Sequence, residues 1–333
     1  AYYFRVNFFV EQTEDLWSRS VHFYPNGAFF AGFGDFSSYY TNWVIAWYEN
    51  AWYPYQWSEP FQGDVLNYYS YPPLFLYFLL ALWRPGASAF WIAFPLVLAD
   101  AACSGVVFLI LEKIMAGKQA NSLAVFGGLV MTLAPINLIY DGVYWLNPGP
   151  VALFTLICFY FAIHEKWWQT FFWLAIATMT KQNALFFSYP LFMALLGQKT
   201  RTKGIKRTIL ESGGIVGLFL LVCFLVSIPW LFISPVNYGI HMLIPGKTLE
   251  LSSVLLEPPP NQCTQFSWSL YILGLRGWLL TFFSFGINSM LLMVVAAIII
   301  ATILCWRTYN LELDTLEFFE WLASYAILTH LFL

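Results

Sequence analysis

Long apolar segments without a charge restrict this chain to a few folds. Residues 212–236 and 277–306 contain no Asp, Glu, Lys or Arg, and residues 88–111 contain only Asp100. Further uncharged segments cover 121–140, 148–163, 169–180 and 183–197. A membrane-crossing helix needs about 20 apolar residues, and a sequence rich in Leu, Ala and Phe favours helices over alternating barrel strands. We therefore expect an all-α fold, a polytopic transmembrane bundle whose shorter members extend into flanking residues or cross a thinned bilayer.

The low charge excludes several classes of protein. Charged residues make up 10% of the sequence, whereas about a quarter of a soluble domain is charged. A soluble enzyme of ordinary composition and a disordered chain are excluded, and a net charge of -3 gives no basis for a nucleic-acid partner. The five cysteines have no ligand spacing, so we expect neither a disulfide framework nor a zinc site. The start at Ala1 and the apolar end from Trp321 to Leu333 suggest a fragment.

Basic residues predict the orientation in the lipid bilayer. Five of them crowd the segment from Lys199 to Arg207. Counting spans places four more on the same side, namely Lys113, Lys118, Lys166 and Arg307. Basic residues concentrate in cytoplasmic loops, so the large loops are expected on the opposite face, an ER lumen or a cell exterior.

Four segments follow from this orientation. We expect an outer loop over 1–87, transmembrane helices over 88–236, a second outer loop over 237–276, and C-terminal transmembrane helices over 277–333. The run from Leu74 to Trp83 is only about three helical turns long, so it predicts a re-entrant or interfacial helix within the first outer loop. Function should lie on the outer face, because the cytoplasmic connections are short.

The first outer loop is rich in aromatic residues, with 14 of them between residues 36 and 71. Aromatic side chains with a polar tip suit both the lipid interface and stacking on sugar rings, so a belt and a sugar platform both stay open. Asp35 follows Gly34, which lets the backbone approach a ligand closely. Asp35 could instead cap a helix beginning at Tyr39, and the sequence alone favours this structural role.

Other isolated polar residues lie between the apolar runs. Lys181 stands in a tight turn on the outer face, where a lone lysine is costly and marks a functional candidate, although it could snorkel to the surface. Residues 141–147 join two spans and could bind a polar ligand or cap the next helix. Lys247, in the second outer loop, could bind a phosphate or be a solvated charge. Asp100 needs an internal partner, for which Lys181 or Arg84 are candidates, and a structural pairing is favoured.

These motifs, in this order, resemble the GT-C superclass of polyprenyl-phosphate-sugar-dependent membrane glycosyltransferases. Gly34-Asp35-Phe36 is similar to an Asp-aromatic motif in the first lumenal loop of that superclass, and Tyr71-Pro72-Pro73-Leu74 to the segment that opens its non-spanning helix. Lys181-Gln182-Asn183-Ala184-Leu185 is the most specific match, and Pro245-Gly246-Lys247 with Glu250 is a loose one. The chain most resembles the ER dolichyl-phosphate-glucose glucosyltransferases, and also prokaryotic mannosyltransferases. It departs from the ER enzymes at 141–147, where they have a His-rich motif.

The resemblance implies transfer of a hexose, such as mannose or glucose, from a polyprenyl or dolichyl phosphate to a hydroxyl of a lipid-linked glycan or protein. Asp35 would be the catalytic base of an inverting displacement, and no metal or other cofactor is required. Lys181 and Lys247 are candidate cations for the leaving phosphate. The residues expected to bind substrate are Tyr39, Tyr71, Asp141, Tyr144, Trp145, Asn147, Lys181, Gln182, Lys247 and Glu250.

Two other functions stay open on the sequence. A multi-pass transporter or flippase for a lipid-linked or polar solute would use Asp100 and Lys181 along its pathway. The lack of an internal repeat and the one-sided aromatic loop count against it. A non-catalytic subunit of a membrane complex is the third possibility.

Overall fold

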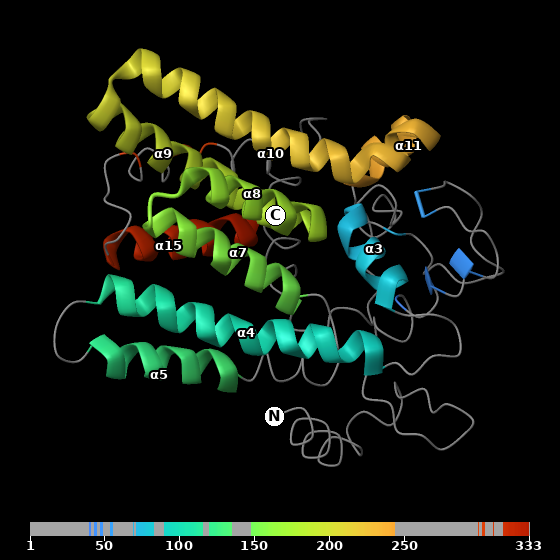
Figure 1. Cartoon of the computed structure of the whole chain (residues 1–333), viewed down its shortest axis with the longest axis horizontal. Helices are drawn as coiled ribbons and strands as arrows, with labels where there is room; N and C mark the ends of the chain where they lie inside the picture. Colours follow the sequence, from blue (N-terminus) through green and yellow to red (C-terminus); the bar gives the residue numbers. More distant parts are fainter. Residues whose placement is uncertain are drawn as a thin grey trace, which may run out of the picture. The chain divides into compact units, whose positions relative to one another are not determined.

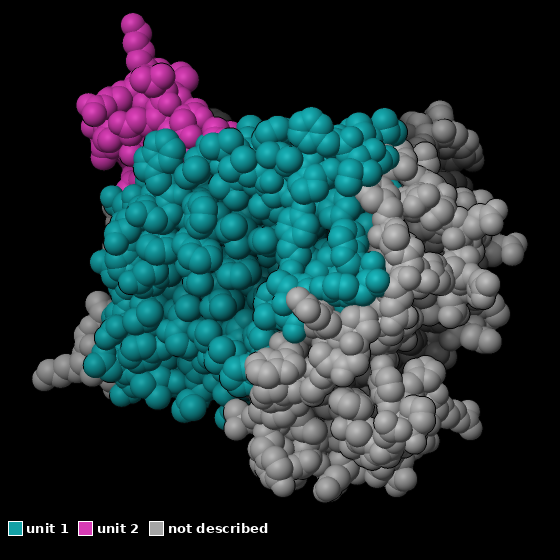
Figure 2. All heavy atoms as spheres, turned by 45° about the vertical axis from the view of Figure 1, so that its right-hand side comes forward, with its two compact units in different colours: residues 1–184, 218–245 teal, residues 185–217, 246–333 magenta. Residues whose placement is uncertain are grey.

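In the computed structural model the described residues form helices and no strand (Figure 1). Those residues are 40, 43–44, 47–48, 54–55, 69, 71–82, 90–115, 120–134, 148–243, 299, 302–303, 309 and 316–332. The chain divides into two compact units, coloured separately in Figure 2. Unit 1 comprises residues 1–184 and 218–245, and unit 2 comprises 185–217 and 246–333. The expected all-α class is confirmed for the described part.

Unit 1 is built from packed helix pairs. Its helices are α3 (Pro73–Leu82), α4 (Phe90–Ile114), α5 (Ala120–Leu133), α7 (Pro148–Ile163), α8 (Trp167–Thr180), the second part of α10 (Ile205–Ile233) and α11 (Pro235–Leu243). Helix α4 packs on α5 and α7, α7 packs on α8, and α3 contacts both α8 and α4. Gly128 lets helix α5 come close to α4, because a Cβ at this position would lie only 3.1 Å from the Ser104 carbonyl oxygen. The Ser104 and Thr132 hydroxyls share a hydrogen bond of 2.6 Å across the same interface, a pattern typical of helices packed in lipid.

Unit 2 contains the first part of α10 together with α9 (Ser188–Lys203) and α15 (Leu316–Phe332). Tyr325 of α15 is buried against Phe186 and Met193, and its hydroxyl donates to the Phe186 carbonyl at 2.7 Å. Arg201 of α9 donates to the Tyr309 carbonyl at 2.9 Å. These contacts join two segments of unit 2 that are more than 100 residues apart.

Within the described residues, two helices are long and apolar enough to cross a membrane, over Phe94–Ile114 and Ile205–Ile233. Only 28% of either apolar segment is buried, whereas a core helix of a soluble protein would be mostly buried. Large apolar side chains face outward, with Phe126 64%, Leu133 63% and Phe232 81% exposed. Exposed apolar surface on this scale marks an interaction site for a membrane or a protein, and together with the two long apolar helices it supports association with a membrane.

Several expected boundaries agree with the helices. Helix α3 is a short helix beginning at Pro73, and α7 spans the whole uncharged segment 148–163. Helix α8, with 14 residues, gains only Trp167 and Trp168 beyond its run, and helix α9, with 16 residues, begins at Ser188 and extends past its run to Lys203. Neither reaches the length of a membrane span, so the expected extension of these short runs to full spans stays a prediction. At Lys181 the chain makes the expected turn, closed by the Ala184 N–H that donates to the Lys181 carbonyl at 3.2 Å, and a 3₁₀ helix, η4 (Gln182–Phe187), continues the chain from this turn to Ser188. Helix α11 occupies the start of the segment expected as a second outer loop.

Candidate functional site

Lys181 and Tyr71, 110 positions apart, meet in unit 1. The Lys181 ammonium nitrogen lies 5.5 Å from the centroid of the Tyr71 ring. Lys181 ends α8 in an extended conformation, and its N–H donates to the Ala177 carbonyl at 3.0 Å. Tyr71 stands just before Pro72 and Pro73, where a proline starts α3 without losing a helical hydrogen bond. The two helix ends thus bring a cation over an aromatic face.

Behind Tyr71 lies a group of interlocking rings, here called the aromatic cluster. Its members are Tyr40, Trp43, Tyr55, Tyr69, Tyr71, Phe75, Trp230 and Tyr238. Tyr71 meets Trp43 at 5.9 Å and Tyr69 at 5.8 Å between centroids, both edge to face. Tyr55 continues the cluster to Trp230 of α10 at 5.2 Å.

The aromatic cluster changes the interpretation of the first outer loop. Tyr40, Trp43 and Tyr55 are at most 2% exposed, so they form neither an interfacial belt nor a platform open to a sugar. Tilted and edge-to-face packing of buried rings contributes about 0.5–1.5 kcal/mol per pair beyond the burial itself. For these residues the aromatic composition reflects a core that holds α3 against α10.

Two tyrosine hydroxyls fix the backbone in front of α3. Tyr55 donates to the Tyr71 carbonyl at 3.0 Å, and Tyr69 donates to the Pro72 carbonyl at 2.8 Å. Burial raises the pKa of Tyr69 well above its usual value, so its phenol stays protonated and remains a donor. The position of the Tyr71 ring, and with it the place of Lys181, depends on these bonds.

Replacing Tyr69 by Phe should therefore destabilise the protein by about 0.5–1.5 kcal/mol, the usual net value of one buried hydrogen bond. Thermal unfolding of the purified protein in detergent measures the loss. Tyr48 provides a matched control, since its hydroxyl donates to the Leu80 carbonyl at 2.9 Å but its side chain is exposed. Equal destabilisation by Tyr48→Phe would contradict a special role for the Tyr69 hydroxyl.

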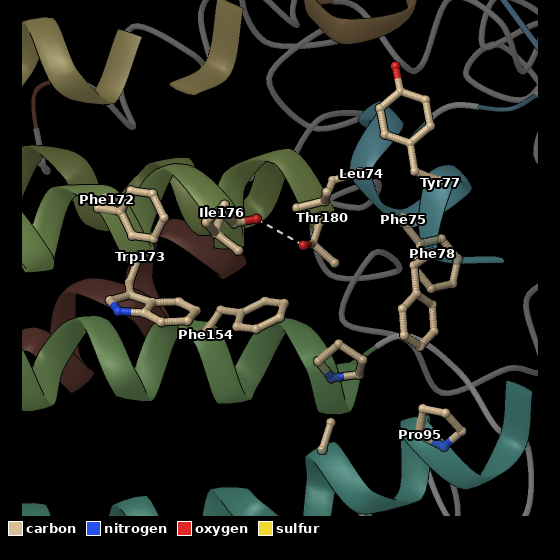
Figure 3. Close-up of a pocket in the computed structure, with 12 residues that line it drawn as sticks. Leu74, Phe75, Tyr77, Phe78, Pro95, Phe154, Phe172, Trp173, Ile176 and Thr180 are labelled. Carbon is tan, nitrogen blue, oxygen red and sulfur yellow. Dashed lines mark hydrogen bonds between the residues drawn. The ribbon is translucent and has the colours of Figure 1, made fainter. Parts of the chain in front are cut away.

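An apolar cavity of about 600 Å³ lies between α3, α4, α7 and α8 (Figure 3). Its lining consists of Leu74, Phe75, Tyr77, Phe78, Pro95, Ala99, Pro150, Phe154, Phe172, Trp173, Ile176 and Thr180. The Thr180 hydroxyl donates to the Ile176 carbonyl of its own helix at 2.8 Å, so it is already satisfied. The Tyr77 hydroxyl donates to the Val226 carbonyl of α10 at 3.0 Å. The cavity thus offers hydrocarbon surface to a ligand.

Two charged residues directly follow cavity-lining residues in the sequence. Thr180 lines the cavity, and Lys181 follows directly at the end of α8. Ala99 also lines it, and Asp100, 2% exposed on α4, comes next. A cation at the end of a helix that lines an apolar cavity suits a lipid with an anionic head.

The structure describes three of the predicted site residues. It brings Tyr71 and Lys181 together, and Gln182 follows Lys181 as the first residue of η4. The remaining predicted residues lie outside the described part of the chain, namely Asp35, Tyr39, Asp141, Tyr144, Trp145, Asn147, Lys247 and Glu250. The convergence of Asp35 on Lys181 therefore stays a prediction.

The cavity and the tyrosine hydroxyls were missed by the sequence reasoning. Residues that line the cavity have the same apolar character as residues that face lipid, so no local signal separates them. Comparison with protein-family models, with curated proteins and with solved structures finds no match for this chain.

Proposed function

We propose that this chain is a multi-pass membrane glycosyltransferase of the GT-C type. It would move a hexose from a polyprenyl or dolichyl phosphate to a hydroxyl of a lipid-linked glycan or protein, on the non-cytoplasmic face. One observation supports this proposal most. Lys181 lies over the Tyr71 ring, and the residue before it in the sequence, Thr180, lines an apolar cavity. A lipid whose phosphate binds Lys181 could therefore place its hydrocarbon chain in this cavity.

The chemistry assigned to the site is a single displacement. The acceptor oxygen attacks the anomeric carbon, the bond from that carbon to the phosphate oxygen breaks, and the configuration inverts. Asp35 takes the proton of the acceptor hydroxyl. The lipid phosphate departs with an added negative charge, which Lys181 stabilises at the membrane surface. The reaction needs no change of oxidation state, and its charges balance within these groups.

The cavity lining favours transfer over transport of a polar solute. A pathway for a polar solute needs polar groups along its walls. Among the described residues, the cavity is lined by hydrocarbon, and the hydroxyls of Tyr77 and Thr180 are used in bonds to carbonyls. Such walls accept an apolar chain at little cost.

The direct test uses the full chain purified in detergent. It is incubated with polyprenyl phosphate carrying radiolabelled mannose or glucose, and with lipid-linked oligosaccharide or peptide acceptors. We expect time-dependent transfer of label from one lipid-phosphate sugar, and none from the corresponding nucleotide sugar. Solute counterflow in liposomes without any transfer of sugar would instead identify a transporter and overturn the proposal.

A further inference from the structure

Three basic side chains of unit 2 converge on one carboxylate. Glu211 of α10 accepts from Lys199 at 2.8 Å, from Lys203 at 2.9 Å and from Arg207 at 3.1 Å. Gly204 joins α9 to α10 with a φ of 76°, a left-handed conformation that residues with a Cβ adopt at a cost. This link lets the last turn of α9 and the first turns of α10 face the same carboxylate.

The Glu211 carboxylate neutralises only part of the positive charge around it. Residues 199–211 contain five basic residues and one acidic residue, which leaves a net charge of +4. Lys206 and Arg207 lie exposed on the first turn of α10. Exposed guanidinium and ammonium groups around a filled ion pair attract a second anion, and phosphate oxygens suit both donor types.

Helix α10 is longer than the hydrocarbon core of a bilayer, so its charged first turns can lie outside that core. At about 1.5 Å per residue, its 29 residues span about 43 Å, which exceeds a hydrocarbon core of about 30 Å. Its charged residues all fall within 205–211, and residues 212–233 carry none. When the uncharged part crosses the core, the charged turns lie at the level of the lipid headgroups.

The apolar surface of the same turns supports this placement. Ile205 and Ile209, one turn apart on the same face, are each 66% exposed, and Leu210 is 79% exposed. A segment with exposed isoleucine and leucine beside lysine and arginine suits the boundary between acyl chains and headgroups. The acyl chains of an anionic lipid can then contact the apolar side chains, and its headgroup can contact the basic ones.

We propose that the Glu211 cluster and the first turn of α10 bind the phosphate of an anionic phospholipid. The cluster is defined as Lys199, Lys203, Lys206, Arg207 and Glu211. The proposal depends on α10 crossing the membrane and is independent of glycosyl transfer. It assigns the cluster to a bilayer lipid, whose acyl chains lie along Ile205 and Ile209.

The test measures binding of short-chain lipids to the full chain in a neutral detergent at low salt. Dioctanoyl phosphatidylglycerol should bind at least ten times more tightly than dioctanoyl phosphatidylcholine, which has the same chains and no net charge. Replacing Lys206 and Arg207 together by Ala should weaken phosphatidylglycerol binding about 10- to 30-fold. A charge-matched control, Lys113→Ala with Lys166→Ala, should leave it unchanged.

Glu211→Gln should change the affinity for phosphatidylglycerol in the opposite direction. It removes the competing carboxylate, so phosphatidylglycerol binding should become tighter, even where the double alanine variant fails to fold. Equal binding of the two lipids, or unchanged or weaker phosphatidylglycerol binding by Glu211→Gln, would overturn the proposal. Inorganic phosphate binding as tightly as phosphatidylglycerol would identify a soluble anion and overturn it as well.

Discussion

Replacing Asp35 by Asn should lower the rate of sugar transfer by about 10²–10⁴-fold, the usual contribution of a general base. The amide keeps the shape of the side chain and still forms hydrogen bonds, but it cannot take the proton of the acceptor hydroxyl at neutral pH. The measurement is the initial rate of label transfer from the lipid-phosphate sugar at saturating donor. Binding of the donor should change little, because the proton is taken only during the reaction.

A second carboxylate of the same loop provides the control for this prediction. Asp64→Asn removes one acidic group from the aromatic-rich segment without touching the assigned base, so transfer should stay within about two-fold of the unmodified chain. The proposed capping role of Asp35 is tested by the same variant, since Asn is as good a cap as Asp. Near-normal turnover of Asp35→Asn would mean that Asp35 is structural and that the base lies elsewhere.

The sequence predicts the ends of a helix where residues that start or stop helices, such as proline, are present. Pro72-Pro73 predicts the start of α3, and Pro148 together with the uncharged run to Ile163 predicts α7. Boundaries that lack such signals moved, because lysine and arginine are good helix formers and do not end a helix. Helix α9 thus extends to Lys203, where Gly204 ends it.

The aromatic cluster shows where sequence reasoning stops. Trp43 and Tyr55 are residue types typical of an interfacial belt. Each is nevertheless buried against rings from distant parts of the sequence. Tyr55 meets Trp230 across 175 positions, and no periodicity within either segment encodes that pairing. The same holds for Tyr71 and Lys181, which the family resemblance named separately. Their contact depends on the packing of α3 against α8.

Lys181→Met is the second variant with a large expected effect. It removes the ammonium group that lies over the Tyr71 ring but keeps a flexible apolar stem, so the protein should fold and the leaving phosphate should lose its cation. Loss of one preorganised group of this kind lowers turnover about 10²–10³-fold. Lys181→Arg keeps the charge and should restore part of the rate, with the shortfall set by the different shape of the guanidinium.

The chain contains a matched control for the structural part of this change. Lys166 also lies over an aromatic ring, 5.9 Å from the centroid of Phe161, at the start of α8. A cation over a ring contributes about 0.5–2 kcal/mol, so Lys166→Met should lower the stability by about that amount and Lys181→Met by at least as much. Only Lys181→Met should lower the rate of transfer by about 10²–10³-fold, because Lys166 lies at the opposite end of α8 from the assigned phosphate. Equal rates for the two variants would show that Lys181 has a structural role, and the leaving-group role would then pass to another cation.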